Sequence, residues 1–257
     1  MAVKWVSAAL FGLGLVAAGG AQALAVNDLI EGDGAVCFGD CSDTGSGERF
    51  TFKILINPRS GDFYTDGSNE FQSSFGDTVV IGMAGNADPI MIASISAIDF
   101  GAPTTFGFTF TSPFAPTAPA GAMLNSMATL TGTLSDADGG DGAVSATAFL
   151  ASSTIMQTLV QGVPVTAVGP TASSNVGAGG TLGYGPHSAS MAFTCPATGC
   201  DNFGIQLAFT GAGGGDQYQF TATHELTPAQ GVPAPIPLML IGFGLLGMGG
   251  ARRLIPS

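Results

Sequence analysis

The chain has 257 residues, of which 46% are hydrophobic and 9% are charged, and its net charge is −12 at neutral pH. All 18 acidic residues lie between Asp28 and Glu225, where Arg49, Lys53 and Arg59 alone oppose them, so this body carries a net charge of −15. Three cations cannot neutralise a phosphate backbone, so nucleic-acid binding is excluded, and an anionic membrane surface would repel the body as well.

The first 25 residues have the layout of a secretory signal peptide. Lys4 precedes an apolar core at residues 6–18, and two overlapping Ala-x-Ala patterns follow. A basic start, an apolar core of this length and a small-residue cleavage site are the marks of export. We therefore predict a signal peptide that uses the Sec translocon and is removed by signal peptidase before Leu24 or Val26.

Four cysteines form two tight pairs along the chain, C-F-G-D-C and C-P-A-T-G-C. In an exported protein an even number of closely spaced cysteines favours disulfides. Three pairings are available, and we expect Cys37–Cys41 together with Cys195–Cys200. A zinc site that uses all four cysteines is the alternative, although structural zinc sites usually use C-x2-C hooks and both gaps here are longer.

Apolar and polar residues alternate along the body, which spans residues 26–231 and is long enough for one domain with its own core. In RFTFKILI, for example, Phe50, Phe52 and Ile54 fall on one side, and such alternation marks half-buried antiparallel strands. The same pattern recurs at residues 104–111, 127–134, 202–210 and 218–226, with further candidates at 78–84, 90–100, 143–150, 163–168 and 188–195. About ten strands at this spacing predict an all-β fold, an antiparallel β-sandwich or jelly-roll-like body.

Two segments depart from this alternation. The stretch SPFAPTAPAGA at residues 112–122 carries three prolines, and we expect it to cross between sheets. In TAFLASSTIMQTLVQ at residues 147–161 the apolar positions fit neither the strand period nor the helix period, and a short helix is an alternative there.

The acidic loop SDADGGDGAVS at residues 135–145 offers Asp136, Asp138 and Asp141 as candidate calcium ligands. Counted from Asp136, the sixth and twelfth positions hold Asp141 and Thr147, whereas an EF-hand loop needs glycine and glutamate there. Asp and Gly are also the usual turn formers, so a simple turn is the preferred interpretation. Apart from calcium at this loop, no cofactor is expected.

The loop of C-P-A-T-G-C separates two strand-like segments by four residues, an ordinary hairpin length. Residues that face each other across such a loop lie at a distance that a disulfide bridges. We therefore expect the bond between Cys195 and Cys200 to close a β-hairpin.

No catalytic residue is assigned from the sequence. It contains neither a G-x-S-x-G elbow nor an H-E-x-x-H pair nor a phosphate-binding glycine loop. Its two histidines are His187, expected in an exposed turn, and His224, which shares the inward side of the last strand with Phe220 and Leu226. A packed His224 is favoured over a catalytic one.

Two further functions are compatible with an exported, strand-rich body. A secreted glycan-active hydrolase needs only two carboxylates at the right separation, and 18 acidic residues make such a pair easy to find. A carbohydrate- or calcium-binding module is the other alternative. The only tryptophan, Trp5, lies in the predicted signal peptide, so the body lacks the aromatic side chain that sugar platforms favour.

The chain ends in an uncharged, mostly apolar stretch at residues 232–251, followed by Arg252 and Arg253. A helix of about 20 apolar residues spans a bilayer. Paired arginines stay on the cytoplasmic side, so the body would face outward. We predict a C-terminal transmembrane sorting helix that transiently anchors the exported protein in the inner membrane, with the two arginines as the membrane stop.

A proline motif, an apolar Gly/Leu-rich helix and a terminal Arg pair, in this order, resemble the PEP-CTERM sorting tail of Gram-negative bacteria. The motif consists of Val232, Pro233, Ala234 and Pro235, with Ala234 where the family usually has glutamate. The resemblance implies processing by an exosortase-like membrane protease and association with exopolysaccharide in a biofilm or floc. The predicted parts are then a signal peptide (1–25), a body (26–231) and a sorting tail (232–257) of a non-enzymatic cell-surface or extracellular-matrix protein.

Overall fold

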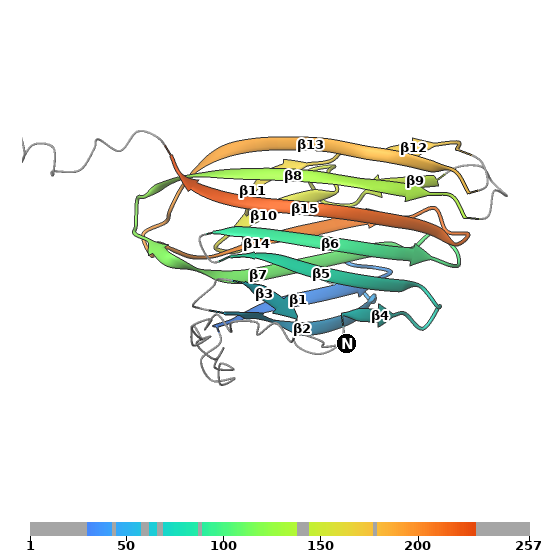
Figure 1. Cartoon of the computed structure of the whole chain (residues 1–257), viewed down its shortest axis with the longest axis horizontal. Coiled ribbons are helices and arrows are strands. Elements are labelled where there is room, and N and C mark those ends of the chain that lie inside the picture. Colours follow the sequence, from blue (N-terminus) through green and yellow to red (C-terminus); the bar gives the residue numbers. More distant parts are fainter. Residues whose placement is uncertain are drawn as a thin grey trace, which may run out of the picture.

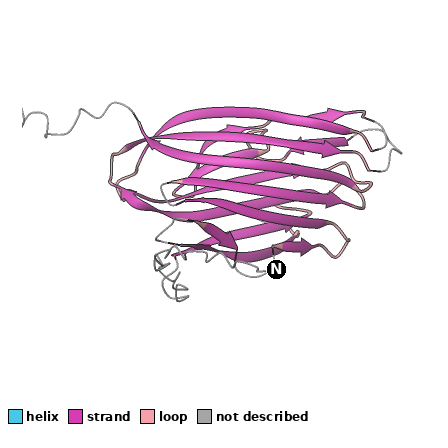
Figure 2. Ribbon diagram, in the orientation of Figure 1, coloured by secondary structure: helices cyan, strands magenta, loops and turns pink. Residues whose placement is uncertain are grey.

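The computed structural model describes residues 30–42, 45–57, 62–65, 69–86, 89–137, 144–176 and 179–229. Within these ranges every strand pairing is antiparallel and no helix occurs (Figure 2). The expectation of an all-β, antiparallel body is therefore confirmed. The predicted signal peptide and sorting tail lie outside the described residues.

One sheet has nine strands and lies behind the other in Figure 1. Seven of its strands follow one path, in the order β11 (Val163–Val168), β10 (Met156–Val160), β14 (Cys200–Thr210), β7 (Thr105–Ala118), β1 (Ile30–Phe38), β2 (Glu48–Ile56) and β3 (Phe63–Thr65). Outside this path, β9 (Val144–Ala148) pairs with β14, and β12 (Ala172–Ser174) pairs with β9.

The other sheet has six strands and forms the front layer in Figure 1. Its order is β13 (Thr181–Thr194), β8 (Met123–Ser135), β15 (Asp216–Pro228), β6 (Ile90–Asp99), β5 (Thr78–Asn86) and β4 (Glu70–Gln72). Because β7 and β8 follow each other in the chain but belong to different sheets, the proline-rich segment does cross between sheets, as predicted. The crossing itself is short, since β7 continues to Ala118.

The two sheets enclose one hydrophobic core in a sandwich-like arrangement. The alternation seen in the sequence places Phe106 and Phe108 of β7 in the core, and on the facing sheet it places Phe220 of β15 there. The ring of Phe209 on β14 lies 5.3 Å from that of Phe106 and 5.0 Å from that of Phe220, measured between centroids. Aromatic contacts therefore join the two layers at the centre.

The alternative of a helix within residues 147–161 is wrong. β9 ends at Ala148 and β10 begins at Met156, and both pair with β14, at Phe209 and Leu207 respectively. Residues 149–155 form a loop between these two strands, which pair one after the other with β14. This arrangement explains why the apolar positions of the segment follow no single period.

The hairpin predicted at the second cysteine pair is also wrong, although the disulfide itself is present. β13 ends at Thr194 in the six-stranded sheet, whereas β14 begins at Cys200 in the nine-stranded sheet. The loop is a corner between sheets, and it lies beside the β7–β8 crossing, since the Cys195 N–H donates to the Ala122 carbonyl (2.9 Å). A hairpin and a corner both bring the ends of a short loop together, so spacing along the sequence cannot distinguish them.

His187 does not lie in a turn. It belongs to β13, just after a cis peptide bond between Gly185 and Pro186 and a shift in the register of pairing with β8. Its ring is half-buried and meets the ring of Tyr184 edge to face, with centroids 4.7 Å apart. The Gly-Pro pair marks an irregularity inside a strand.

Candidate functional site

All four cysteines are paired as predicted. Cys37 and Cys41 form one disulfide and Cys195 and Cys200 the other, with Cα atoms 5.7 Å and 5.5 Å apart. No cysteine is therefore free to bind zinc or to act as a nucleophile. Such bonds indicate that the protein folds in an oxidising compartment.

His224 is packed, as expected, and it forms the centre of a polar network between the sheets. Its Nδ1 donates to the Gly204 carbonyl (2.9 Å), and its Nε2 accepts from the Ser126 hydroxyl (3.1 Å). The Ser126 hydroxyl also meets the hydroxyls of Thr158 and Thr166 at 3.0 Å and 3.1 Å. All four side chains are buried, and burial lowers the pKa of His224 to about 4. The hydrogen bonds of the Ser126–His224 pair therefore link the two sheets.

Two buried carboxylates hold loops at the right-hand end of the sheets in Figure 1. Asp99 accepts from the backbone N–H groups of Thr104 and Gly213 at 3.1 Å and 3.0 Å, and Asp77 accepts from that of Phe100 at 2.9 Å. Burial raises the pKa of Asp99 to about 6, and the backbone hydrogen bond from Thr104 partly opposes the rise. These carboxylates act as caps for loop backbone.

Asp136, the first candidate calcium ligand, is also buried at this end. Asp138 and Asp141 lie outside the described residues, so the structure does not place the three together. Among the residues that are described, no group of three or more His, Cys, Asp or Glu side chains is arranged to hold a metal ion. Calcium binding at this loop stays a prediction.

A groove of 880 Å³ opens at the same end. Phe75 and Phe149 line it and are exposed, together with the carboxylates of Asp40 and Glu48. Hydrogen bonds from Ser42 lower the pKa of Asp40, and hydrogen bonds from Ser74 lower that of Glu48. Both carboxylates therefore favour the ionised form, which accepts hydrogen bonds and does not supply a proton.

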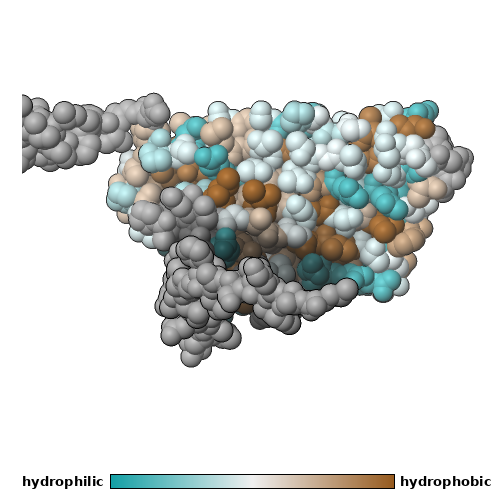
Figure 3. All heavy atoms as spheres, viewed as in Figure 1, coloured by the Kyte–Doolittle hydropathy of each residue, from teal (hydrophilic) through white to brown (hydrophobic). Residues whose placement is uncertain are grey.

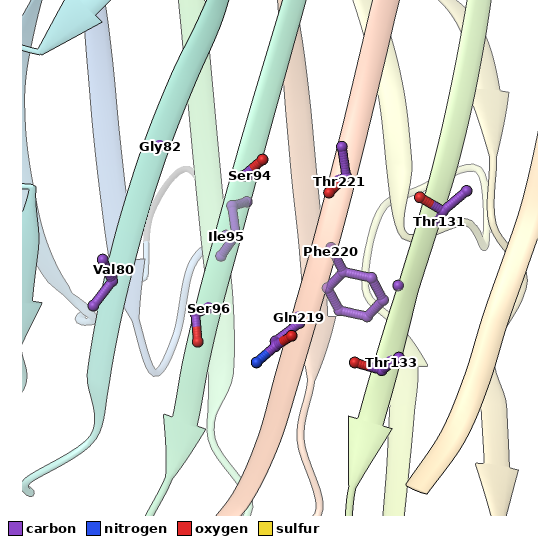
Figure 4. Close-up of a pocket in the computed structure, with 11 residues that line it drawn as sticks. Val80, Gly82, Ser94, Ile95, Ser96, Thr131, Thr133, Gln219, Phe220 and Thr221 are labelled. Carbon is purple, nitrogen blue, oxygen red and sulfur yellow. The ribbon is translucent and has the colours of Figure 1, made fainter.

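A second groove, of 480 Å³, lies on the outer face of the six-stranded sheet (Figure 4). Val80 of β5 lines one side, and small hydroxyl and amide side chains on the three neighbouring strands form two cross-strand rows. One row consists of Thr131, Thr221 and Ser94, and the other of Thr133, Gln219 and Ser96. Neighbouring strands lie about 4.8 Å apart and alternate residues about 7 Å apart along a strand, so the rows form a regular polar grid. We name these six residues the hydroxyl face.

Two glycines and the inward-facing ring of Phe220 shape this groove. Gly82 leaves a gap beside Ser94, and Gly132 lies beneath the groove between the two rows. A Cβ on Gly132 would meet the Phe220 ring and the Gln219 carbonyl, so this position needs glycine for close packing. No charged side chain lines the groove, and Figure 3 shows pale, near-neutral spheres across the middle of this face.

From the sequence, the threonines of this groove are predicted only to lie on the polar side of strands. Alternation in MATLTGTL and YQFTATHEL predicts that they face solvent. Which strands lie side by side depends on long-range pairing, because β8, β15 and β6 are far apart in the chain. The grid is therefore visible only in the folded protein.

The sorting motif at residues 232–235 and the arginines at 252 and 253 lie outside the described residues. In the part of the chain that is described, no helix is long and apolar enough to cross a membrane. The predicted anchor therefore remains an expectation from the sequence.

No protein-family model matches the chain, and no curated protein matches it. Among solved structures, one match is the enzymatically active domain of tailspike protein 4 from bacteriophage CBA120, at 12% sequence identity and a TM-score of 0.24. The match covers 67% of this chain and spans 22% of the tailspike chain. Similarity at this level establishes neither a shared fold nor a shared activity.

Proposed function

We propose that the chain is an exported, non-enzymatic cell-surface or extracellular-matrix protein that contacts neutral polysaccharide through its hydroxyl face. In this proposal the C-terminal tail holds the body at the inner membrane until an exosortase-like protease processes it. The body then reaches the cell surface or the surrounding matrix.

Two features of the body support export and an independent fold. Both disulfides fit an oxidising compartment outside the cytoplasm. The core cluster is formed by residues between Val36 and Leu226, and the last strand ends at Pro228. The described part of the body therefore has its own core.

The hydroxyl face is the observation that carries the proposed glycan contact. Serine and threonine hydroxyls and the glutamine amide each donate and accept hydrogen bonds, as sugar hydroxyls do. A body with a net charge of −15 repels acidic polysaccharide, and the groove lacks the charges that would bind a cationic one. Neutral glycan is the partner that remains.

Removing hydroxyls from the face tests this proposal. Each lost hydrogen bond costs about 1 kcal/mol, so the triple variant Ser94→Ala, Thr131→Val and Thr221→Val should bind neutral exopolysaccharide roughly a hundredfold more weakly. The change in the dissociation constant is measured by calorimetry on residues 26–231.

A matched control removes three hydroxyls from the outer face of the other sheet, by Thr51→Val, Thr109→Val and Ser145→Ala. This variant should bind as the unmodified body does. Equal binding by both variants, or no binding by the unmodified body to any neutral glycan, would show that the hydroxyl face is not a glycan site.

Sorting is tested separately in cells. A chain that ends at Gly231 should leave the envelope, whereas the complete chain should be held there before release. The intact mass of the released protein reports whether the tail has been removed. Retention of the shortened chain would contradict the role of the tail.

A second candidate function is glycan hydrolysis in the 880 Å³ groove. It is favoured by two exposed aromatic side chains, Phe75 and Phe149, that line one groove with Glu48, whose ionised carboxylate suits a nucleophile or a base. The same glycan panel distinguishes the candidates, because hydrolysis would release sugars from the unmodified body and not from Glu48→Gln. Binding without release supports the first candidate.

A further inference from the structure

Charged residues are distributed very unevenly along the chain. Twelve of the 18 acidic residues and all three basic residues of the body lie within residues 28–99, which we call the charge-rich region. Residues 100–200, the charge-poor region, contain only three charged residues, Asp136, Asp138 and Asp141. Most of their strands lie apart, with β1–β5 in the lower part of Figure 1 and β8–β13 in the upper part, while β6 and β7 lie between them in the two sheets.

The six-stranded sheet ends on the charge-poor side with β13, the last strand of its path. β13 pairs with β8 along one edge, and no described strand pairs with its other edge. Pro186 interrupts its first half, whereas the segment from His187 to Thr194 pairs in continuous register with β8. This eight-residue segment, which we call the open edge, contains no charged residue.

The other sheet edges carry the devices that prevent strand pairing between molecules. β3 and β4 are three residues long, and β4 begins with Glu70. β11 is six residues long and has Pro164 as its second residue. Short length, charge and proline all protect an edge, and the open edge of β13 has none of them.

Exposed methionines lie on both faces of the sheet near the open edge. Met191 on β13 is 54% exposed, and Met123 and Met127 on β8 are 53% and 43% exposed. Met127 pairs with Ser190 and Met123 with Thr194, so these two lie on the outer face, one strand in from the edge. Met191 pairs with the buried Ser126 and therefore lies on the opposite face of β13. Methionine is flexible and polarisable, which suits a contact surface.

We propose that two copies of this chain associate through the open edge of β13. The two strands would pair antiparallel about a twofold axis, which joins the two six-stranded sheets into one continuous sheet. Among the possible contacts between two copies, charge favours this geometry. Each body carries −15, and pairing through the charge-poor sides keeps the two charge-rich regions at opposite ends of the dimer.

The test measures the mass of the body, residues 26–231, by light scattering and sedimentation over a wide range of concentration. The expected result is a dimer that persists or tightens when salt is added, because salt screens the repulsion between acidic bodies and the contact itself is uncharged. A body that is monomeric at every concentration and salt level overturns the proposal.

Lysine on the open edge should abolish the contact. Ser190→Lys with Ala192→Lys places two charges on exposed positions of β13, and dimerisation should weaken roughly tenfold or more. The matched control, Ser94→Lys with Thr221→Lys, places the same charges on the hydroxyl face of the same sheet and should still dimerise. A dimer that survives the edge lysines, or one that is lost equally in the control, overturns the proposal.

Hydrogen exchange on the unmodified body decides the question even if the lysine variant fails to fold. Backbone amides on the unpaired side of residues 187–194 should exchange more slowly as the protein concentration rises. Exchange that does not depend on concentration in a dimer would place the contact elsewhere and contradict pairing through β13. Glycan binding is measured in separate samples and does not enter this test.

Discussion

The charge-rich and charge-poor regions share one core and present different surfaces. In the charge-rich region, Lys53 of β2 lies 2.8 Å from Asp33 and 3.7 Å from Glu31 on exposed strand faces. In the charge-poor region, β8 and β13 present hydroxyl groups and methionines instead. The comparison teaches that one core supports both regions, and that the distribution of charge on the surface determines which side is suited to contacts.

If the two regions share one core, a cavity at their junction should destabilise both together. Phe209 is fully buried and meets the rings of Phe106 and Phe108 in its own sheet and of Tyr218 and Phe220 in the other. Phe209→Ala should cost about 3–5 kcal/mol in the free energy of unfolding. Thermal melts should still show one transition, shifted to lower temperature.

The control for this variant is Phe75→Ala, because Phe75 is 83% exposed. Its effect should stay within about 0.5 kcal/mol. Two separate melting transitions in Phe209→Ala, one for each region, would show that the two regions are independent and would contradict a shared core.

A buried group packed against the charge-poor strands and one in the charge-rich region should respond oppositely to pH. The pKa of His224 falls from 6.5 to about 4 on folding. The contribution of His224 to the free energy of unfolding is therefore complete above pH 6.5, and about 3 kcal/mol of it is lost as the pH falls toward 4. The pKa of Asp99 rises from 3.8 to about 6, so its contribution is present at low pH and is lost as pH rises through 6.

Single variants separate the pH dependence of stability due to His224 from that due to Asp99. Relative to the unmodified protein, His224→Gln should gain stability as pH falls from 6.5 to 4, and Asp99→Asn should lose it over the same range. Denaturant titrations at several pH values measure the difference. Identical pH profiles for the unmodified protein and His224→Gln would mean that His224 is not held neutral by burial.

The smallest effect is expected for the exposed ion pairs of the charge-rich region. Lys53→Ala should lower the melting temperature slightly at low salt, and the difference should vanish at high salt, because exposed ion pairs are weak and screened. Thr51→Ala, on the same exposed side of β2, is the matched control and should show no salt dependence. A shift for Lys53→Ala that persists in high salt would indicate lost packing.

Most strands of the core could be predicted from alternation alone. The predicted range 163–168 coincides with β11, and 49–56 differs from β2 by one residue. β1 was missed because Gly32 and Gly34 interrupt its apolar pattern. A Cβ on Gly34 would meet the Phe52 ring and one on Gly32 would meet the Thr111 carbonyl, so close packing requires the residues that obscure the strand.

The predictions that were wrong concerned the arrangement of segments in space. The disulfide of Cys195 and Cys200 was predicted correctly, whereas its place at a corner between sheets was not. His187 was assigned to a turn because Gly-Pro pairs usually mark turns, and long-range pairing with β8 instead continues the strand through it. In both cases a contact between distant residues decided the outcome.

The sequence by itself determined the class of fold, the two disulfides, the acidity of the body and the prediction of export, because period, spacing and composition are local properties. The tertiary structure decided which strands are neighbours, and with them the hydroxyl face, the network around His224 and the open edge of β13. Each of these features joins residues from distant strands, and strand order is set by the packing of the whole core. A sequence pattern with a period of two carries no information about that order.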